Sequence, residues 1–458
     1  MKKTINIGLA GYGTVGRGVV SILLSKNEEL SRRAGAKLRL KRICDKSFAD
    51  TTKGKTSPRQ SPPQDKNIKG LLPAGRVYTP DIEDIFSDPE IDIFVELLGG
   101  YQPAKRLMLL ALDKGMDVVT ANKNVLAKDF NELLSAAAKN KRRIYFEASA
   151  GAGIPVIAAI NEGLCANEIY ALTGIVNGTT NYILSNMSEG KADFADSLKK
   201  AQKLGFAEAD PTLDITGGDS ASKLAILSSL IFKSHIKPSD IHVEGIEQVK
   251  PFDIELGREL GYTIKLVALM EKVKPEAGTA LAKSGAAFQV APVFIKSSHP
   301  LASVSGAFNA VYLKTDAAGD QMFYGPGAGS LPAASAVASD IVYSARHIME
   351  KSSLHMPFFE LKNKPPRIAD AREVESCFYL RFTAEDKPGV LARIADVLAD
   401  HGISVASVVQ KDGFSHKAVP IVVLTHEART GNLINAVNEI DKLKMVKSKT
   451  VYYRLLDI

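Results

Sequence analysis

The pattern of apolar and polar positions in the first third of the chain predicts strands that alternate with helices. Residues 91–98 (IDIFVELL) form a nearly continuous apolar run, which is typical of a strand in a parallel sheet covered on both faces. Val19, Val20, Ile22 and Leu23 follow a glycine loop at helical spacing. Further strands are predicted at residues 4–10, 38–44, 117–120 and 143–148, and a helix is predicted at residues 103–114.

The middle of the chain alternates less regularly, which indicates an α+β domain with a mixed or antiparallel sheet. Strands are predicted at residues 168–176, 243–249, 264–273, 288–296 and 310–314. Residues 206–218, broken by Pro211 and by Gly217-Gly218, are predicted to be a loop before a helix that opens at Asp219. A second glycine-rich segment, residues 321–330, precedes a long predicted helix at residues 332–349.

The last part of the chain follows a polar, proline-interrupted segment, residues 361–372, that is typical of a linker. Its predicted elements are a strand, a helix, two strands, a helix and a strand, at residues 376–383, 388–401, 403–410, 418–425, 429–443 and 449–455. This βαββαβ order is ferredoxin-like. The predicted fold class is α/β: a Rossmann-type domain, an α+β domain for substrate binding and dimerisation, and a ferredoxin-like domain. The predicted bounds are 1–150 with about 321–350, then 151–320, a linker at 351–375, and 376–458.

Composition limits the classes of protein that remain. The 458 residues are 45% hydrophobic and 24% charged, as in an ordinary globular protein. No apolar run is long enough to span a bilayer, and the start of the chain enters a glycine loop instead of a cleavage site. Cys44, Cys165 and Cys377 show no ligand spacing and are predicted to pack in the core. We expect a cytoplasmic protein with no membrane partner.

The net charge of +7 comes largely from residues 37–76, and no aromatic-and-basic pattern accompanies it. We therefore expect no nucleic-acid partner. Within that region, residues 47–75 are polar and rich in Pro, Lys and Ser, so a mobile surface excursion is predicted.

A G-x-G-x-x-G motif lies between the first predicted strand and helix, and it consists of Gly11, Tyr12, Gly13, Thr14, Val15 and Gly16. The first glycine permits the turn, the second lets a pyrophosphate approach the backbone, and the third lets helix meet strand. The alternative is a plain glycine turn in a flavodoxin-like unit. The strand before and the helix after favour dinucleotide binding.

Two further places are predicted to lie beside the cofactor. Asp45 and Lys46 end the second strand; an acid there suits the ribose of NAD and a cation suits the 2′-phosphate of NADP, so the preference stays open. Asp45 could equally be a turn residue. Leu98, Gly99 and Gly100 end the third strand and are expected near the nicotinamide.

Residues 205–223 gather four acids, Glu208, Asp210, Asp214 and Asp219, around one cation, Lys223. Asp219 and Lys223 are four apart on the predicted helix and share a face. A capped helix with a solvated ion pair is the alternative. However, the helix continues into an apolar run, and an amine pressed toward a core becomes a usable acid–base group.

Two long segments carry a resemblance to a known family. Residues 205–227 (GFAEADPTLDITGGDSASKLAIL) and residues 174–184 (GIVNGTTNYIL) resemble the catalytic segment of homoserine dehydrogenases. The resemblance implies NAD(P)H-dependent interconversion of L-aspartate 4-semialdehyde and L-homoserine, in threonine, methionine and isoleucine biosynthesis. Another amino-acid dehydrogenase, such as one acting on aspartate, and a non-catalytic nucleotide or amino-acid sensor are the alternatives.

The resemblance also implies roles for individual residues. Lys223 would give the proton to the aldehyde oxygen, and Lys123, in a TANK-like segment, would polarise that oxygen or position substrate and nicotinamide. Gly325 would lie near the cofactor. The implied substrate-binding residues are Gly205, Glu208, Asp219, Asp214 and Thr179.

A cation site is predicted after the strand at residues 143–148. The small residues that follow leave carbonyl oxygens accessible, and Glu147 adds a carboxylate, a donor set that suits a monovalent cation. The resemblance implies a sodium-like ion, Na or K, held by Glu147, Ala150, Ala152 and Ile154. A tight strand-to-helix turn is the alternative.

The ferredoxin-like part carries a second resemblance. Residues 386–391 (DKPGVL) resemble the ligand loop of ACT domains, so Asp386, Pro388, Gly389 and Val390 are candidate regulatory residues. Pro388 is expected in the first helical turn, and Gly389 would let a ligand carboxylate approach free N–H groups. The resemblance implies feedback by an amino acid, threonine first, in a homodimer or homotetramer. The alternative is a domain used only for oligomerisation.

Overall fold

The structure is a computed structural model that describes residues 4–53, 77–190, 192–273, 285–350, 365–410 and 418–456. Its contacts divide the chain into two compact units. The first comprises Met1–Glu168, Ser222–Pro238 and Asp316–Pro365, and the second comprises Ile169–Ala221, Ser239–Thr315 and Pro366–Ile458. Among the described helices, none is long and apolar enough to cross a bilayer.

The first unit contains a parallel sheet of six strands in the order β3-β2-β1-β4-β5-β6. The strands are β1 (Thr4–Ala10), β2 (Lys37–Cys44), β3 (Tyr78–Thr79), β4 (Ile91–Glu96), β5 (Asp117–Thr120) and β6 (Ile144–Tyr145). From β1 the strand order extends to β2 and β3 on one side and to β4, β5 and β6 on the other. The loops after β1 and β4 therefore lie side by side at one edge, as in dinucleotide-binding sheets. The predicted strands are confirmed, although β6 is shorter than predicted.

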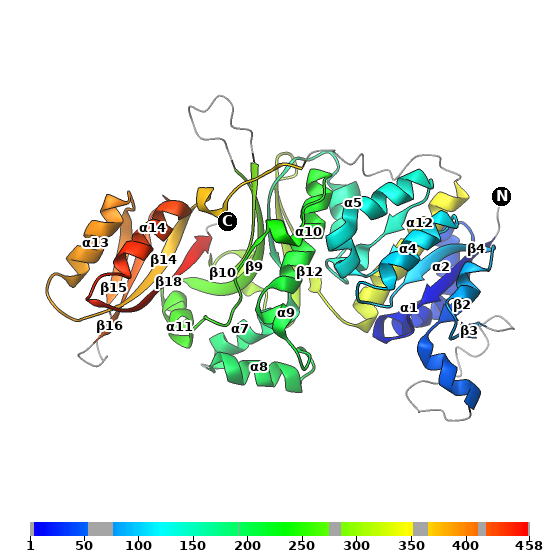
Figure 1. Cartoon of the computed structure of the whole chain (residues 1–458), viewed down its shortest axis with the longest axis horizontal. Helices are drawn as coiled ribbons and strands as arrows, with labels where there is room; N and C mark the ends of the chain where they lie inside the picture. Colours follow the sequence, from blue (N-terminus) through cyan, green and yellow to red (C-terminus); the bar gives the residue numbers. More distant parts are fainter. Residues whose placement is uncertain are drawn as a thin grey trace. The chain divides into compact units, whose positions relative to one another are not determined.

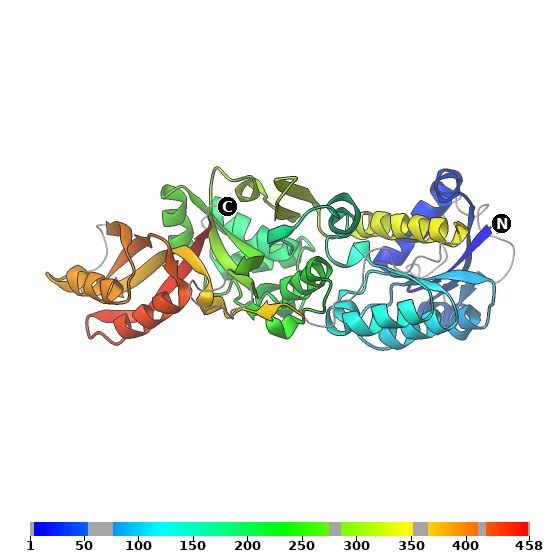
Figure 2. The ribbon, with the colours of Figure 1, turned by 90° about the horizontal axis from the view of Figure 1, so that it is seen from above.

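Helices cover both faces of this sheet, which explains why its strands are apolar on both sides. On one face pack α1 (Thr14–Ser25), α2 (Asn27–Ala34) and α12 (Ser330–Met349), and on the other α4 (Ala104–Asp113) and α5 (Lys123–Lys139) (Figure 2). Val19 and Leu23 of α1 and Val337 of α12 share one buried cluster with the strands. Shorter elements of the unit are η1 (Lys46–Lys53), α3 (Glu83–Phe86), η2 (Glu147–Ser149), α6 (Val156–Ala158), η3 (Ala159–Gly163) and β12 (Asp320–Pro326).

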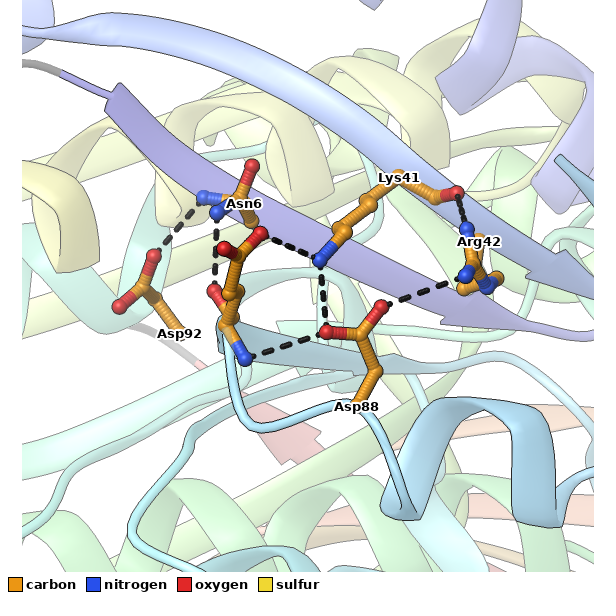
Figure 3. A network of polar contacts seen from close by, with 6 residues as sticks. Asn6, Lys41, Arg42, Asp88 and Asp92 are labelled. Atoms are coloured by element: carbon orange, nitrogen blue, oxygen red, sulfur yellow. Dashed lines mark hydrogen bonds and ion pairs between the residues drawn. The ribbon is translucent and has the colours of Figure 1, made fainter. Parts of the chain in front are cut away.

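A polar network fixes the turn that leads into β4 (Figure 3). Lys41 Nζ lies 2.6 Å from Asp88 Oδ1 and 2.6 Å from Glu90 Oε2, and Arg42 reaches the other oxygen of Asp88 at 3.4 Å. The backbone N–H of Asn6 donates to Asp92 at 2.8 Å. The network therefore connects β2, β1 and the start of β4, at the end of the strands opposite the glycine loop.

The second unit is built on a mixed sheet in which β11-β7-β9-β10-β18-β14-β16-β15 are neighbours in that order. These strands are β7 (Ile169–Ile175), β9 (Tyr262–Val273), β10 (Gly285–Lys296), β11 (Phe308–Thr315), β14 (Glu375–Ala384), β15 (Val405–Gln410), β16 (Val419–Thr425) and β18 (Val446–Leu456). The short strands β8 (His242–Val243) and β13 (Arg367–Ile368) pair with β10, and β17 (Ala428–Arg429) pairs with β14.

The helical elements of the second unit fall into two sets. The first is α7 (Gly178–Gly190), α8 (Phe194–Lys203), α9 (Thr212–Ile215), the start of α10 (Gly218–Phe232), η4 (Pro238–Asp240), α11 (Pro251–Glu259) and η5 (Pro300–Ser303). The second is η6 (Ala371–Glu373), α13 (Val390–Asp400) and α14 (Thr430–Ile440); α13 and α14 are drawn beside β14, β15 and β16 in Figure 1. Leu398 of α13 and Leu433 of α14 share a buried core with Phe378 and Phe382 of β14. The predicted βαββαβ order is confirmed.

Some sequence-based predictions are wrong. The strand predicted at 243–249 ends at Val243. The first half of the glycine-rich segment, for which no strand was predicted, lies in β12. The predicted surface excursion begins with η1, whose Phe48 is buried; residues 54–76 lie outside the described residues. Cys165 is exposed, not packed in the core. Pro388 precedes α13 instead of starting it.

Candidate active site

The glycine loop between β1 and α1 has the geometry that a bound pyrophosphate requires. Gly11 has a φ of +102°, and a Cβ there would lie 2.5 Å from the carbonyl oxygen of Leu97. A Cβ on Gly16 would lie 2.0 Å from the carbonyl oxygen of Gly11. Gly13, the exposed N-cap of α1, has open space where a Cβ would be. The loop therefore fits a phosphate at the helix N-terminus.

Asp45 lies where the sequence predicts it, directly after β2, and it holds the glycine loop. Its Oδ2 accepts a hydrogen bond from the N–H of Tyr12 at 2.6 Å, and its Oδ1 accepts one from the N–H of Ser47 at 2.9 Å. Burial acts to raise the pKa of Asp45, but these bonds and the charge of Arg17 hold it below its ordinary value. Arg17 and Lys46 are both exposed. An ionised acid and two cations therefore border this loop.

The remaining residues of the glycine motif differ in exposure. Tyr12 is buried, and its ring packs with Phe48 and Tyr78 at centroid distances of 5.6 and 6.0 Å. Thr14 is exposed and Val15 is half-buried. The tyrosine therefore anchors the loop in an aromatic cluster, while its neighbours stay accessible to a ligand.

The turn after β4 is held by Glu96, which the sequence analysis did not single out. Glu96 is fully buried; its Oε1 accepts from the N–H of Leu98 at 2.8 Å and its Oε2 from Thr120 Oγ1 at 2.7 Å. Burial raises the pKa of Glu96 against the effect of these hydrogen bonds. Gly99 then turns the chain with a φ of +72°. An acid at the C-terminal end of a buried apolar strand, beside the predicted cofactor turn, was the signal that could have revealed this support.

Lys123 is the first residue of α5 and is half-buried. The helix begins at Asn122, whose Oδ1 accepts from the N–H of Val125 at 3.2 Å and whose Nδ2 donates to the carbonyl oxygen of Gly100 at 2.8 Å. One amide thus fixes both the turn after β4 and the start of α5. The structure places Lys123 next to the predicted cofactor residues of the first unit.

In the second unit, a single amide joins two of the predicted acids. Asn177 Nδ2 donates to Asp214 Oδ1 at 2.7 Å and to Asp219 Oδ2 at 2.9 Å, and Asp219 is 6% exposed. Asn177 lies directly before α7 and also accepts from the N–H of Thr180 at 2.9 Å. Asn177 lies within the motif at residues 174–184, but no role was predicted for it. An Asn before a Gly-Thr-Thr helix start was the available signal.

The loop between α8 and α9 carries the other predicted substrate residues. Thr179 Oγ1 donates to the carbonyl oxygen of Phe206 at 2.6 Å, next to Gly205, which is exposed with a φ of +79°. Glu208 is exposed, and its carbonyl oxygen accepts from Gln202 Nε2 at 3.2 Å. The structure thus brings Asp214 and Asp219 together, and it leaves the side chain of Glu208 at the surface of the unit.

The helix that carries Lys223 confirms the predicted start and corrects the loop before it. The segment predicted to be all loop contains α9, and α10 begins at Gly218. Asp219 lies in the first turn of α10, and Lys223 follows four residues later and is half-buried. The next four residues, 224–227, are fully buried. The chain passes from the second unit into the first within this helix.

The predicted cation loop follows β6. Both oxygens of Glu147 accept backbone hydrogen bonds, from Ile157 at 2.8 Å and from Ala158 at 2.7 Å, so the carboxylate caps α6. Burial raises the pKa of Glu147 to about 7. Ala152 has a φ of +48°, and Ile154 accepts from the N–H of Val156 at 2.8 Å.

The oxygen atoms around this loop are the donors that a monovalent cation accepts. In the part of the chain that the structure describes, no three His, Cys, Asp or Glu side chains gather as a metal cluster. A cation here would therefore depend on the carbonyl oxygens of Ala150, Ala152 and Ile154. A positive charge would offset the cost of burying Glu147, so the residues present fit such an ion.

Gly325 is buried in β12, and a Cβ there would lie 3.3 Å from Ile154 Cγ1. The neighbouring Pro326 accepts a hydrogen bond from the N–H of Gly153 at 3.3 Å. Gly325 thus packs against the loop after β6, within the first unit.

The loop predicted to bind a regulatory ligand lies before α13. Gly389 is the N-cap of α13 with a φ of +87°, and a Cβ there would meet open space. Asp386 and Pro388 are exposed, whereas Val390 is buried. Asp386 Oδ1 accepts from Gln410 Nε2 at 3.3 Å, which joins the loop to β15.

Three family models match the chain. The homoserine dehydrogenase NAD-binding domain matches residues 11–147, the homoserine dehydrogenase model matches residues 155–342, and the ACT domain matches residues 378–444. A homoserine dehydrogenase of Neisseria gonorrhoeae is 38% identical over 99% of both chains.

Solved structures give the same result. A homoserine dehydrogenase from Thiobacillus denitrificans has a TM-score of 0.88 and 39% identity, covering 100% of this chain and 99% of that one. A hyperthermophilic archaeal homoserine dehydrogenase in complex with NADPH has a TM-score of 0.59 and 27% identity, covering 74% of this chain and 97% of that one.

Proposed function

The chain belongs to the homoserine dehydrogenase family, which interconverts L-homoserine and L-aspartate 4-semialdehyde, and on this basis we propose how its residues share the reaction. Lys223 exchanges the proton with the substrate oxygen. Lys123 polarises that oxygen or positions substrate and nicotinamide. The observation that carries this proposal is the carboxylate pair, Asp214 and Asp219, held by one amide at the start of the helix that carries Lys223.

The acids of the second unit suit the ammonium group of an amino-acid substrate. Asp219 is buried, so a cation beside it offsets the cost of its charge. We assign Asp219 and Glu208 to the ammonium, with the backbone of Gly205 beside it. Asp214 and Thr179 support these substrate-binding residues. Asp214 accepts a hydrogen bond from the Asn177 amide that also binds Asp219, and Thr179 fixes the loop by donating to the carbonyl oxygen of Phe206.

The bound nicotinamide supplies or accepts the hydride. In the oxidation direction, the Lys223 amine takes the proton from the hydroxyl oxygen of homoserine. The hydride leaves the carbon that bears this hydroxyl, and a carbonyl forms. In the reduction direction, the Lys223 ammonium returns the proton to the oxygen as the carbon gains the hydride. Asp219, one helical turn before Lys223, holds the substrate ammonium.

The substitution Lys223→Met tests this assignment. Loss of a general acid–base group costs about 10²- to 10⁴-fold in rate, so we expect kcat to fall by that factor while coenzyme binding stays unchanged. Turnover is measured by nicotinamide absorbance with homoserine, and binding by fluorescence titration. Lys200→Met, on the exposed face of α8, is the matched control and should keep full activity. A Lys223→Met enzyme with near-normal kcat contradicts the role.

For the coenzyme we propose a preference for NADP(H). Both oxygens of Asp45 already accept backbone hydrogen bonds, and the exposed cations Arg17 and Lys46 border the same loop, which suits a 2′-phosphate. The related archaeal enzyme was solved with NADPH. A kcat/KM for NADP at least tenfold above that for NAD is expected, and Lys46→Ala should narrow this ratio. A ratio in favour of NAD contradicts the preference.

We further propose a cytoplasmic homodimer or homotetramer that uses Na or K at the loop after β6 and is inhibited by threonine at the loop before α13. The oxygen donors around Glu147 support the cation, and the open N-terminus at Gly389 supports an amino-acid carboxylate. One set of assays tests both proposals. Thermal stability that is flat across a Na and K titration argues against the cation, and activity that is flat across a threonine titration argues against that effector.

A further inference from the structure

A buried lysine that the proposed reaction does not use lies in the second unit, hydrogen-bonded to a residue of α7. Lys265, on β9, is 3% exposed. Its Nζ donates to Asn181 Oδ1 at 3.2 Å and to the carbonyl oxygen of Val304 at 2.5 Å. Burial of this kind is costly for an ammonium group and is tolerated only where it is well hydrogen-bonded. Pairing of β9 in the sheet does not by itself require a lysine at this position, so its burial indicates a further role.

Asn181 connects this lysine to α7. Its Nδ2 donates to the carbonyl oxygens of Val304 at 3.2 Å and of Phe308 at 3.0 Å. Its own N–H donates to the carbonyl oxygen of Asn177 at 3.2 Å, which closes the first turn of α7. The side chain of Asn181 is thus held by Lys265, Val304 and Phe308, and its backbone belongs to the first turn of α7.

The same first turn carries the groups that arrange the acids. Asn177 bridges Asp214 and Asp219, and Thr179 holds the carbonyl oxygen of Phe206. A continuous series of hydrogen bonds therefore runs from Lys265 through the first turn of α7 to both carboxylates.

We propose that Lys265 is a positioning residue for substrate binding: through Asn181 it fixes the first turn of α7 so that the amide of Asn177 holds Asp214 and Asp219 in place. This inference rests on the proposed role of these acids in holding the substrate ammonium. Lys265 itself touches neither substrate nor coenzyme.

The geometry distinguishes this role from simple packing. A methionine can fill the same space, but it leaves Asn181 Oδ1 without the donor that now fixes it and removes one of the two donors to Val304. The first turn of α7 then loses a fixed point, and the spacing of the two carboxylates relaxes. Because the glycine loop belongs to the other unit, coenzyme binding should not change.

The test compares Lys265→Met with Lys272→Met, which removes a half-buried lysine from the same strand. We expect Lys265→Met to raise the KM for homoserine about tenfold, which corresponds to about 1.4 kcal/mol, with a smaller change in kcat and an unchanged Kd for the coenzyme. Lys272→Met should match the wild type. Active sites are counted by coenzyme titration, so that a loss of folded protein does not register as a change in KM.

Asn181→Ala provides a second route, because it removes the acceptor instead of the donor. It should raise the KM for homoserine to a similar degree, and the double variant should be no worse than either single variant. If Lys265→Met does not fold, Asn181→Ala alone decides. A KM within twofold of wild type in the folded variants overturns the inference. If Asp219→Asn also leaves the KM for homoserine unchanged, the proposed role of the acids has failed instead.

Discussion

Single residues that no motif emphasises hold the candidate site in place. Asn177 and Glu96 each bind two partners from different elements, and each lies next to residues that the sequence did predict. The sequence predicts Asp45, Asp219 and the glycine loop because their spacing relates directly to a ligand. It does not predict the supporting residues, because Thr120 is far from Glu96 in the chain, both acids are far from Asn177, and only the fold brings them together.

Glu96→Gln tests this support at the residue scale. A glutamine places an amide N–H₂ where Glu96 now accepts two hydrogen bonds, so one buried donor loses its acceptor. The expected cost is about 1–3 kcal/mol in the free energy of unfolding, with a higher KM for the coenzyme because residues 98–100 are less well fixed. Urea unfolding and coenzyme titration measure the two effects. Glu83→Gln, at an exposed position of α3, is the control and should change neither quantity.

At the scale of elements, strands and helices with a clear hydrophobic pattern were predicted well, and tertiary contacts explain where the predicted bounds were wrong. The apolar segments of β1, β4 and β9 stand out in the sequence, and all three form strands within two residues of the predicted bounds. Residues 243–249 carry apolar side chains at Val243, Ile246 and Val249, but Gly245 lies so close to α9 that a Cβ would be 2.5 Å from the carbonyl oxygen of Ile215. The strand therefore stops at Val243. No local pattern contains that long-range approach.

The ion pairs at the start of β4 give a pH prediction at this scale. Although burial acts to raise the pKa of Asp88, its bond to Lys41 holds that pKa below the ordinary value. Such a group stabilises the fold above its unfolded-state pKa, and the stabilisation is lost as the pH falls through the lower, folded-state pKa. Lys41→Met should cost between about 1 and 3 kcal/mol at pH 7, and less as the pH falls below about 4.

Arg33→Met is the matched control for this experiment. The pair of Arg33 with Glu29 has side-chain exposures of 61% and 47%, so its loss should cost less than about 1 kcal/mol. Urea unfolding at several pH values measures both variants. A cost for Lys41→Met that does not change between pH 7 and pH 3 contradicts the assigned ion pair.

At the scale of the whole molecule, the ACT part and the catalytic sheet belong to one compact unit. Strand β18 pairs in parallel with β10, from Val293–Arg454 to Ile295–Leu456. Arg381 of β14 reaches the fully buried Asp253 of α11 at 2.6 Å. The sequence shows only a linker and a ferredoxin-like pattern here, because a pairing between strands so far apart in the chain leaves no local signature.

Arg381→Met tests this junction. The substitution leaves the Asp253 carboxylate buried without its cation, which should cost about 3–5 kcal/mol in the free energy of unfolding. Adding Asp253→Asn removes the charge and should recover part of that loss. Differential scanning calorimetry compares the two variants with Lys387→Met, which breaks an exposed pair with Glu385 and should have no effect. If single and double variants are equally unstable, the ion pair is not the cause.

The pairing of β18 with β10 also bears on how the proposed feedback by an amino acid could be tested. Cutting the chain before residue 376 would strip a neighbour from Val293, Phe294 and Ile295, which are now completely shielded from water. The backbone N–H and C=O groups that now pair with β18 would be left unpaired. An exposed strand edge of this kind promotes aggregation with other copies of the chain. Aggregation of a shortened enzyme would mask any change in its response to an amino acid, so the truncation could not locate the proposed effector site. A substitution in the loop at Gly389, which leaves β18 intact, is therefore the better test of the proposed effector site.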